Sequence, residues 1–130
     1  MQEDDLPYAA IVRNISEAFI YADRKGIIRW WSEGAEKLFG FTKEEALGKS
    51  LDLIIPENLR DGHWRGFNAA METGDTKYHG RIMRTRSLHK TEEKIYVEMS
   101  FHLAKDEDGK VLGSSAIARL APPKQPAQPQ

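Results

Sequence analysis

The chain has 130 residues, of which 19 are lysine or arginine and 20 are aspartate or glutamate, so one domain with a buried core is expected rather than two. The net charge of -1 provides no field of one sign, and we therefore expect neither nucleic acid nor a membrane as a partner. The absence of cysteine excludes disulfides, thiolate ligands and a covalent bond between cysteine and a flavin.

The N-terminal region divides into an acidic start and a short helix. Residues 1–6 are expected to be disordered. This start lacks the basic and apolar regions of a signal peptide, and no apolar run in the chain is long enough for a membrane span, so we expect a cytoplasmic location. In residues 7–16, which begin at Pro7, apolar side chains recur every three or four positions, and this spacing predicts an amphipathic helix.

Two apolar segments, residues 18–22 and 27–31, are separated by Asp-Arg-Lys-Gly, a composition that favours a tight turn. They predict a β-hairpin. Trp30 and Trp31 are neighbours on its second strand and therefore point to opposite faces. One of them packs inside, and the other must be covered by the leading helix or by a second subunit.

Short helical pieces are predicted between residues 32 and 55, interrupted at Gly40 and Gly48. The sequence Thr-Lys-Glu-Glu, which begins at Thr42, is typical of a capping box. Pro56 then begins a longer helix. On it, four residues spaced four apart share one face: Leu59, His63, Phe67 and Met71.

His63 is the polar member of that apolar face. A neutral imidazole is a common metal ligand, and burial favours the neutral form, so His63 is a candidate ligand to iron in a haem pocket. The alternative is a buried histidine that hydrogen-bonds a backbone carbonyl, because buried polar groups usually find ordinary partners. Both interpretations are compatible with the position on the helix.

Three strands are expected in the C-terminal half, at residues 77–86, 95–103 and 111–119. The middle strand alternates cleanly, which places Val97, Met99 and Phe101 on one buried face. Two strands, several short helices and three further strands predict an α+β fold. In this fold a five-stranded antiparallel sheet carries the helices on one face.

The stretches NISEAFIYADRKGIIRWWS, from Asn14, and AEKLFGFTKEEALGK, from Ala35, resemble a PAS sensory domain. The resemblance covers residues 7–120 in the family's usual order of elements and implies the PAS fold, with the N-terminal helix as a flank. PAS domains often pair through this flank, so the resemblance also implies a homodimer. Residues 121–130 are expected to be a disordered tail rich in proline and glutamine.

The segment IPENLRDGH, which ends at His63, looks like the corresponding helix of bacterial haem-PAS oxygen sensors, where a histidine binds the haem iron. This resemblance implies haem b as the cofactor, His63 as the iron ligand and a diatomic gas as the molecule that is sensed. The pocket between helix and sheet would be lined by six apolar residues: Leu59, Phe67, Met71, Val97, Met99 and Phe101.

On the opposite side of such a haem, the resemblance points to Arg81 and Met83. Aligning Gly80 with the matching glycine of the haem sensors places Arg81 where they carry a methionine or apolar residue, and Met83 where they carry an arginine. Either Arg81 donates a hydrogen bond to the gas or Met83 occupies the sixth iron position. The alternative for Arg81 is a solvated strand residue, and the remaining histidines are expected at the surface: His79, His89 and His102.

The functional expectation is a haem-binding PAS sensor that binds O2, CO or NO and signals by conformational change. The alternatives are a cofactor-free PAS dimerisation or interaction module, and a PAS domain that holds a non-covalent flavin or a small metabolite. No catalytic motif stands out, so we expect no enzyme activity. Residues 116–120 run into the tail without the Asp-Ile-Thr-like segment that precedes many effectors. We therefore expect an excised or stand-alone domain, or a separate effector protein.

Overall fold

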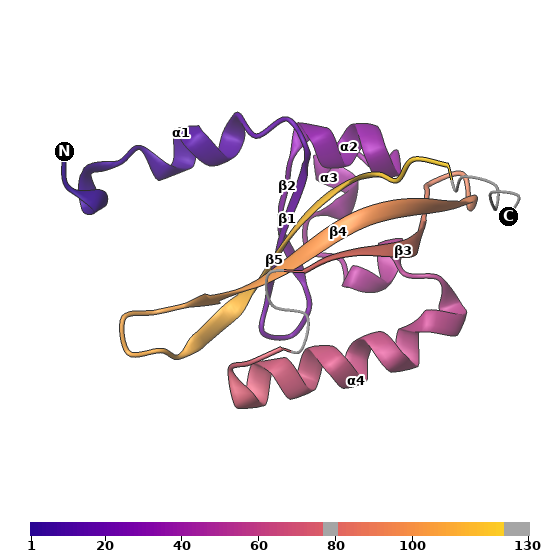
Figure 1. The fold of residues 1–130 in the computed structure, drawn as a ribbon. Coiled ribbons are helices and arrows are strands. Elements are labelled where there is room, and N and C mark those ends of the chain that lie inside the picture. The colour runs from indigo at the N-terminus through magenta and orange to yellow at the C-terminus, as the bar shows by residue number, and fades with distance from the viewer. Residues whose placement is uncertain (77–80, 124–130) are drawn as a thin grey trace, which may run out of the picture.

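The computed structural model describes residues 1–76 and 81–123. At its centre, five antiparallel strands form one sheet in the order β2-β1-β5-β4-β3, and α2, α3 and α4 lie on one face of it (Figure 1). The strands are β1 Ala18–Asp23, β2 Ile28–Trp31, β3 Ile82–Leu88, β4 Lys94–Lys105 and β5 Val111–Leu120. The helices are α1 Tyr8–Arg13, α2 Glu33–Phe39, α3 Lys43–Ala46 and α4 Glu57–Thr73, with 3-10 turns η1 Glu3–Asp5 and η2 Leu51–Ile54. The predicted α+β fold is confirmed.

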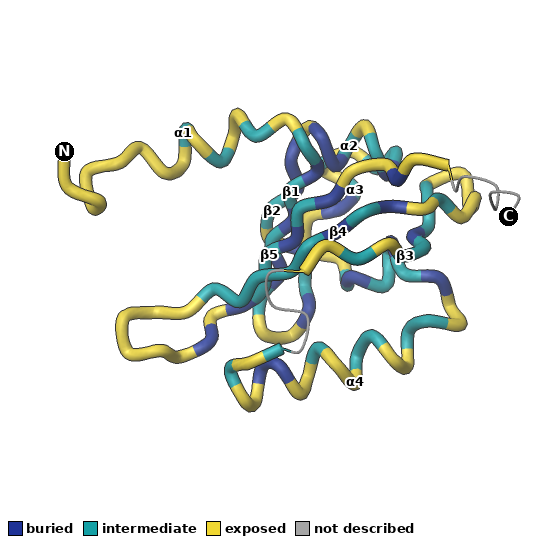
Figure 2. Tube along the Cα trace, viewed as in Figure 1, coloured by how far each residue is buried: buried dark blue, intermediate teal, exposed yellow. Residues whose placement is uncertain are grey.

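The core lies between the sheet and the short helices. Buried residues gather in the central strands and α2, whereas most of α4 alternates between exposed and half-buried residues (Figure 2). The Trp31 ring packs on Phe39 with centroids 5.5 Å apart, and its indole donates to the Phe41 carbonyl at 2.9 Å. Trp31 is thus the inward member of the tryptophan pair, and Trp30 faces outward beside α1.

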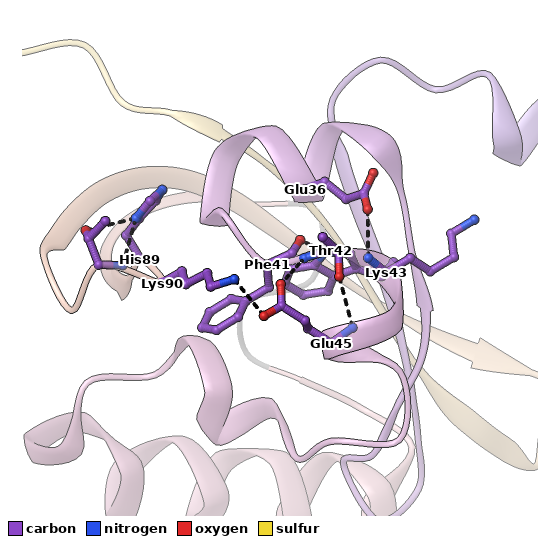
Figure 3. A network of polar contacts seen from close by, with 9 residues as sticks. Glu36, Phe41, Thr42, Lys43, Glu45, His89 and Lys90 are labelled. Carbon is purple, nitrogen blue, oxygen red and sulfur yellow. Dashed lines mark hydrogen bonds and ion pairs between the residues drawn. The ribbon is translucent and has the colours of Figure 1, made fainter.

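The short helices begin and end at the predicted signals. Ser32 caps α2 by accepting a hydrogen bond from its first turn at 3.1 Å, and Gly40 ends this helix in the left-handed conformation, at φ 85°. Thr42 and Glu45 form the predicted capping box of α3 (Figure 3). Glu45 also accepts a hydrogen bond from Lys90 at 2.7 Å, so the turn between β3 and β4 is tied to α3.

The N-terminal region differs from the prediction in two details. α1 ends at Arg13 rather than at residue 16, because Asn14 leaves the helical conformation and the chain then turns toward β1. The η1 turn lies within residues 1–6, for which the sequence predicts disorder. A hydrogen bond of 2.6 Å from the Tyr8 hydroxyl to the Glu3 carbonyl ties this turn to α1.

The third strand continues further than the sequence predicts. It ends at Leu88 instead of residue 86, because the polar Ser87 is buried and pairs with Ile95 on β4. The first residues of the predicted strand, 77–80, lie outside the described residues. Within the described part of the chain, no helix is long and apolar enough to cross a bilayer.

The folded domain extends past residue 120, where the sequence predicts that the disordered tail begins. Ala121 is buried, and its N–H donates to the Tyr96 carbonyl at 2.9 Å. Backbone pairing beside β4 therefore extends one residue beyond β5. Residues 124–130 lie outside the described residues.

Candidate functional site

α4 carries four of the predicted site residues, and they share the face of the helix that is turned toward the sheet. The helix follows Pro56 and ends at Gly74, which adopts a φ of 73°. Along its predicted face, Met71 is buried, and the other three residues are half-buried: Leu59, His63 and Phe67. The backbone of α4 stands further from the sheet than that of α2 (Figure 1). Side chains therefore fill the layer between α4 and the strands.

The imidazole of His63 lies among aromatic rings. It meets Trp64 edge to face at 4.6 Å between ring centroids, and Phe67 at 5.8 Å with the planes tilted by 31°. Its Nδ1 atom is buried and has no hydrogen-bond partner among the residues that the structure describes. Nδ1 therefore does not make the backbone hydrogen bond that one interpretation of the sequence expects, and it is a polar atom in need of a partner.

The protonation state of His63 follows from this environment. Burial lowers the pKa of His63 below its ordinary value of 6.5, and the negative charge of Asp52 opposes the shift without reversing it. The ring is therefore neutral at pH 7. A neutral imidazole keeps the lone pair that a metal ligand needs.

The lowered pKa predicts how the cofactor-free protein responds to acid. The unfolded chain binds a proton at His63 near pH 6.5 and the folded chain binds it only at lower pH, so the free energy of unfolding falls as the pH drops below about 6.5. Urea unfolding at pH 7.5 and pH 5.5 measures this loss, which is expected to be smaller in His63→Phe. An equal loss in both proteins would contradict the burial of His63.

Three polar side chains hold α4 against the rest of the domain, and sequence reasoning missed all of them. The Trp64 indole donates to the Asp52 carboxylate at 2.7 Å. Arg60 donates to the Ile55 carbonyl at 3.0 Å and lies 3.8 Å from that same carboxylate. At the other end of α4, Arg24 donates to the Met71 carbonyl at 3.5 Å and to the Val111 carbonyl at 2.7 Å.

The sheet supplies the second wall of the site. Val97 and Met99 belong to the buried core cluster, and Phe67 of α4 and Phe101 of β4 pack against it. Four predicted residues thus lie in or against one apolar cluster that includes residues of α4 and of the sheet.

The other predicted residues lie around this cluster. Leu59 and Met83 are half-buried. Met83 is paired with Met99 across β3 and β4, so both side chains are on the same face of the sheet. Arg81 is exposed, in agreement with the interpretation of this residue as a solvated arginine.

The remaining histidines have local partners where the structure describes them. Nδ1 of His89, which Figure 3 labels, lies 3.0 Å from the Thr91 hydroxyl. The His89 ring also packs over Gly40. Nε2 of His102 lies 3.3 Å from the Ser100 hydroxyl. His79 lies outside the described residues. Within residues 1–76 and 81–123, no three histidine or acidic side chains gather into a metal site.

The family model described as the PAS fold matches residues 7–120. This chain belongs to the PAS family. The match has the same bounds as the domain predicted from the sequence. It therefore includes α4 with His63 and the whole sheet.

Two sensor proteins are among the curated proteins that are similar to this PAS domain. Sensor protein FixL of Bradyrhizobium diazoefficiens is 39% identical over 54 residues, which are 42% of this chain and 11% of FixL. Oxygen sensor protein DosP of Escherichia coli is 28% identical over 109 residues, which are 83% of this chain and 13% of DosP. The chain thus spans only a small part of the length of these relatives.

Solved structures show the same PAS architecture. A PAS domain from Colwellia psychrerythraea superposes with a TM-score of 0.75 at 22% identity, over 88% of this chain and 93% of that one. An RNA-binding light-oxygen-voltage receptor gives a TM-score of 0.75 at 16% identity, over 92% of this chain and 34% of the receptor. At these identities the likeness concerns the fold alone.

Proposed function

We propose that this PAS domain binds haem b through His63 and serves as a sensor of a diatomic gas. The observation that carries the proposal is the buried, unpartnered Nδ1 of a neutral imidazole on the sheet-facing side of α4. A neutral imidazole has one nitrogen lone pair that can bind a metal, and no described residue forms a hydrogen bond with Nδ1 of His63. The bound haem would supply an iron atom to which O2, CO or NO binds reversibly.

The donor set suits haem better than a bare metal ion. A protein site for a bare ion usually takes several side-chain ligands, whereas His63 belongs to no group of three or more histidine or acidic side chains in the described part of the chain. Haem needs only one strong protein ligand, because the porphyrin itself supplies four nitrogen donors to the iron.

Each wall of the site has a defined task in this proposal. His63 binds the iron, and its neighbours on α4 cover one side of the macrocycle: Leu59, Phe67 and Met71. Val97, Met99 and Phe101 provide the apolar wall on β4, which excludes water. Met83, which is half-buried beside Met99, is better placed to face the ligand than the exposed Arg81.

The similarity to DosP supports this proposal, because that protein is an oxygen sensor and its match covers most of this chain. Titration of the purified protein with haem tests the proposal, with flavin mononucleotide as the competing ligand. We expect saturable uptake of haem at one per chain and no uptake of flavin. Uptake of flavin alone, or of neither ligand, would favour one of the alternatives and contradict the proposal.

The exposed face of α1 supports a second proposal, a homodimer. The helix has six residues, none of them buried, and helices shorter than about 12 residues are marginal in water. Tyr8 and Ile11 expose 49% and 48% of their surface. Beside α1 lies an open hollow of about 330 Å³ whose wall includes Trp30. A second copy that packs on this face would cover the hollow and the exposed apolar residues.

Ile11→Asp is therefore expected to convert a dimer into a monomer, because a carboxylate in an apolar interface loses its hydration. Size-exclusion chromatography with light scattering measures the mass of each species. Leu112→Asp is the matched control, since it places the same charge on an exposed apolar residue of β5. A monomeric wild-type protein, or a dimeric Ile11→Asp variant, would contradict the proposed interface.

A further inference from the structure

Trp64 is clamped between two residues that precede α4 in the chain. Its indole N–H donates to the Asp52 carboxylate at 2.7 Å. The far edge of the same ring lies against Gly26 so closely that a Cβ atom at that position would collide with it. The N-terminal half of α4 is thus attached to η2 on one side of the Trp64 ring and to the β1–β2 turn on the other.

The contacts of Trp64 with Asp52 and Gly26 restrict the directions in which its neighbour His63 can point. Adjacent residues on a helix differ in direction by about 100°, so fixing the Trp64 ring fixes the rotation of α4 about its axis. The His63 ring also rests edge to face on the Trp64 ring, with centroids 4.6 Å apart. The position of the imidazole therefore depends on Trp64 both through the backbone and through direct contact.

Asp52 is the part of the clamp that makes directed bonds. It receives the Trp64 hydrogen bond and lies 3.8 Å from Arg60, one turn earlier on α4. The ion pair is weak because both side chains are substantially exposed, at 36% and 41%. A hydrogen bond to a carboxylate is strong for its class, so the bond from Trp64 contributes more than the ion pair.

We propose that Asp52 is a positioning residue for His63, which acts through Trp64 to hold the imidazole on the sheet-facing side of α4. The consequence for haem affinity rests on the proposed function. The positioning itself is a property of the cofactor-free chain and is measured there.

The test compares Asp52→Ala with Asp52→Asn, which keeps an oxygen acceptor for the indole N–H. Glu45→Ala is the matched control, because Glu45, like Asp52, accepts a hydrogen bond from a distant side chain, yet its partners Thr42 and Lys90 lie outside α4. The readout is the NMR shift of the His63 ring protons in the cofactor-free protein, which the rings of Trp64 and Phe67 perturb. Spectra recorded at pH 8 exclude differences in His63 protonation.

In Asp52→Ala, the His63 ring-proton shifts are expected to move toward their unfolded-chain values, and haem binding is expected to weaken on the order of tenfold. Asp52→Asn should restore most of both properties, and Glu45→Ala should change neither. His63 shifts in Asp52→Ala that match those of the control would overturn the proposal. If the wild-type protein takes up no haem, the proposed function fails, and the NMR comparison still decides the role of Asp52.

Trp64→Phe provides a second route if Asp52→Ala does not fold. This change removes the indole donor, keeps an aromatic ring beside His63, and shortens the ring edge that lies against Gly26. It is expected to move the His63 resonances, and adding Asp52→Leu, which removes the acceptor, should move them little further, because both changes remove the same hydrogen bond. Independent, additive shifts would overturn the proposed route from Asp52 to His63.

Discussion

His63→Ala is expected to weaken haem binding by at least about 100-fold while the PAS fold is retained. The change removes the ligand that we assign to the iron, and even residues that only support a metal ligand cost about 10- to 100-fold in affinity. The fold survives because the side chain is half-buried and its Nδ1 has no hydrogen bond to lose in the described part of the protein. Haem titration followed at the Soret band measures the affinity, and far-UV circular dichroism checks the fold.

Two further measurements show whether the loss of haem binding results from the loss of the bond between His63 and the iron. Free imidazole added to His63→Ala is expected to restore part of the haem binding, since it supplies the missing ligand. His102→Ala is the control, because His102 lies near Ser100 on β4 and has no assigned role in haem binding. A His63→Ala variant with the haem spectrum of the wild-type protein would mean that another group binds the iron.

Gly26→Ala is expected to reduce the free energy of unfolding by about 2 to 5 kcal/mol. Gly26 has a φ of 77°, which costs a residue with a side chain about 1 to 2 kcal/mol. Its new methyl group would also collide with the Trp64 ring, and overpacking of this kind costs about 1 to 3 kcal/mol. Urea denaturation followed by circular dichroism measures the loss.

Gly48→Ala separates these two contributions. Gly48 has a φ of 84°, and a Cβ atom there meets nothing within 4 Å, so this variant carries the backbone strain without the collision. It is expected to lose only about 1 to 2 kcal/mol. If Gly26→Ala and Gly48→Ala lose the same free energy of unfolding, the Trp64 ring does not pack against Gly26. The proposed positioning of α4 would then rest on the hydrogen bond between Trp64 and Asp52 alone.

The elements of this fold are predictable because their signals are local. The capping box at Thr42, the left-handed glycine at Gly40 and the proline before α4 each act within a few residues, and the structure has all three in the predicted roles. Alternation on β4 likewise predicts the buried face that contains Val97 and Met99. The strand ends were less predictable, because the burial of Ser87 depends on its neighbours in space.

Sequence reasoning predicts the helix face that carries the candidate site, but it does not predict the contacts that hold this helix in place. Helical spacing predicts that His63 and Phe67 share the sheet-facing side of α4. The clamp on Trp64 was missed, because it joins Asp52 and Gly26, which lie 12 and 38 residues away and carry no pattern that links them to α4. The one available signal was a tryptophan beside the candidate histidine, since a half-buried indole N–H usually needs an acceptor.

The absorption spectrum of the wild-type protein, expressed with a supply of haem, tests the central claim most directly. We expect a strong Soret band that shifts when the iron is reduced and shifts again when carbon monoxide is added, because the proposed bond between His63 and the iron leaves a position for a gas. A colourless protein that also fails to take up added haem would contradict the assignment of His63 as an iron ligand.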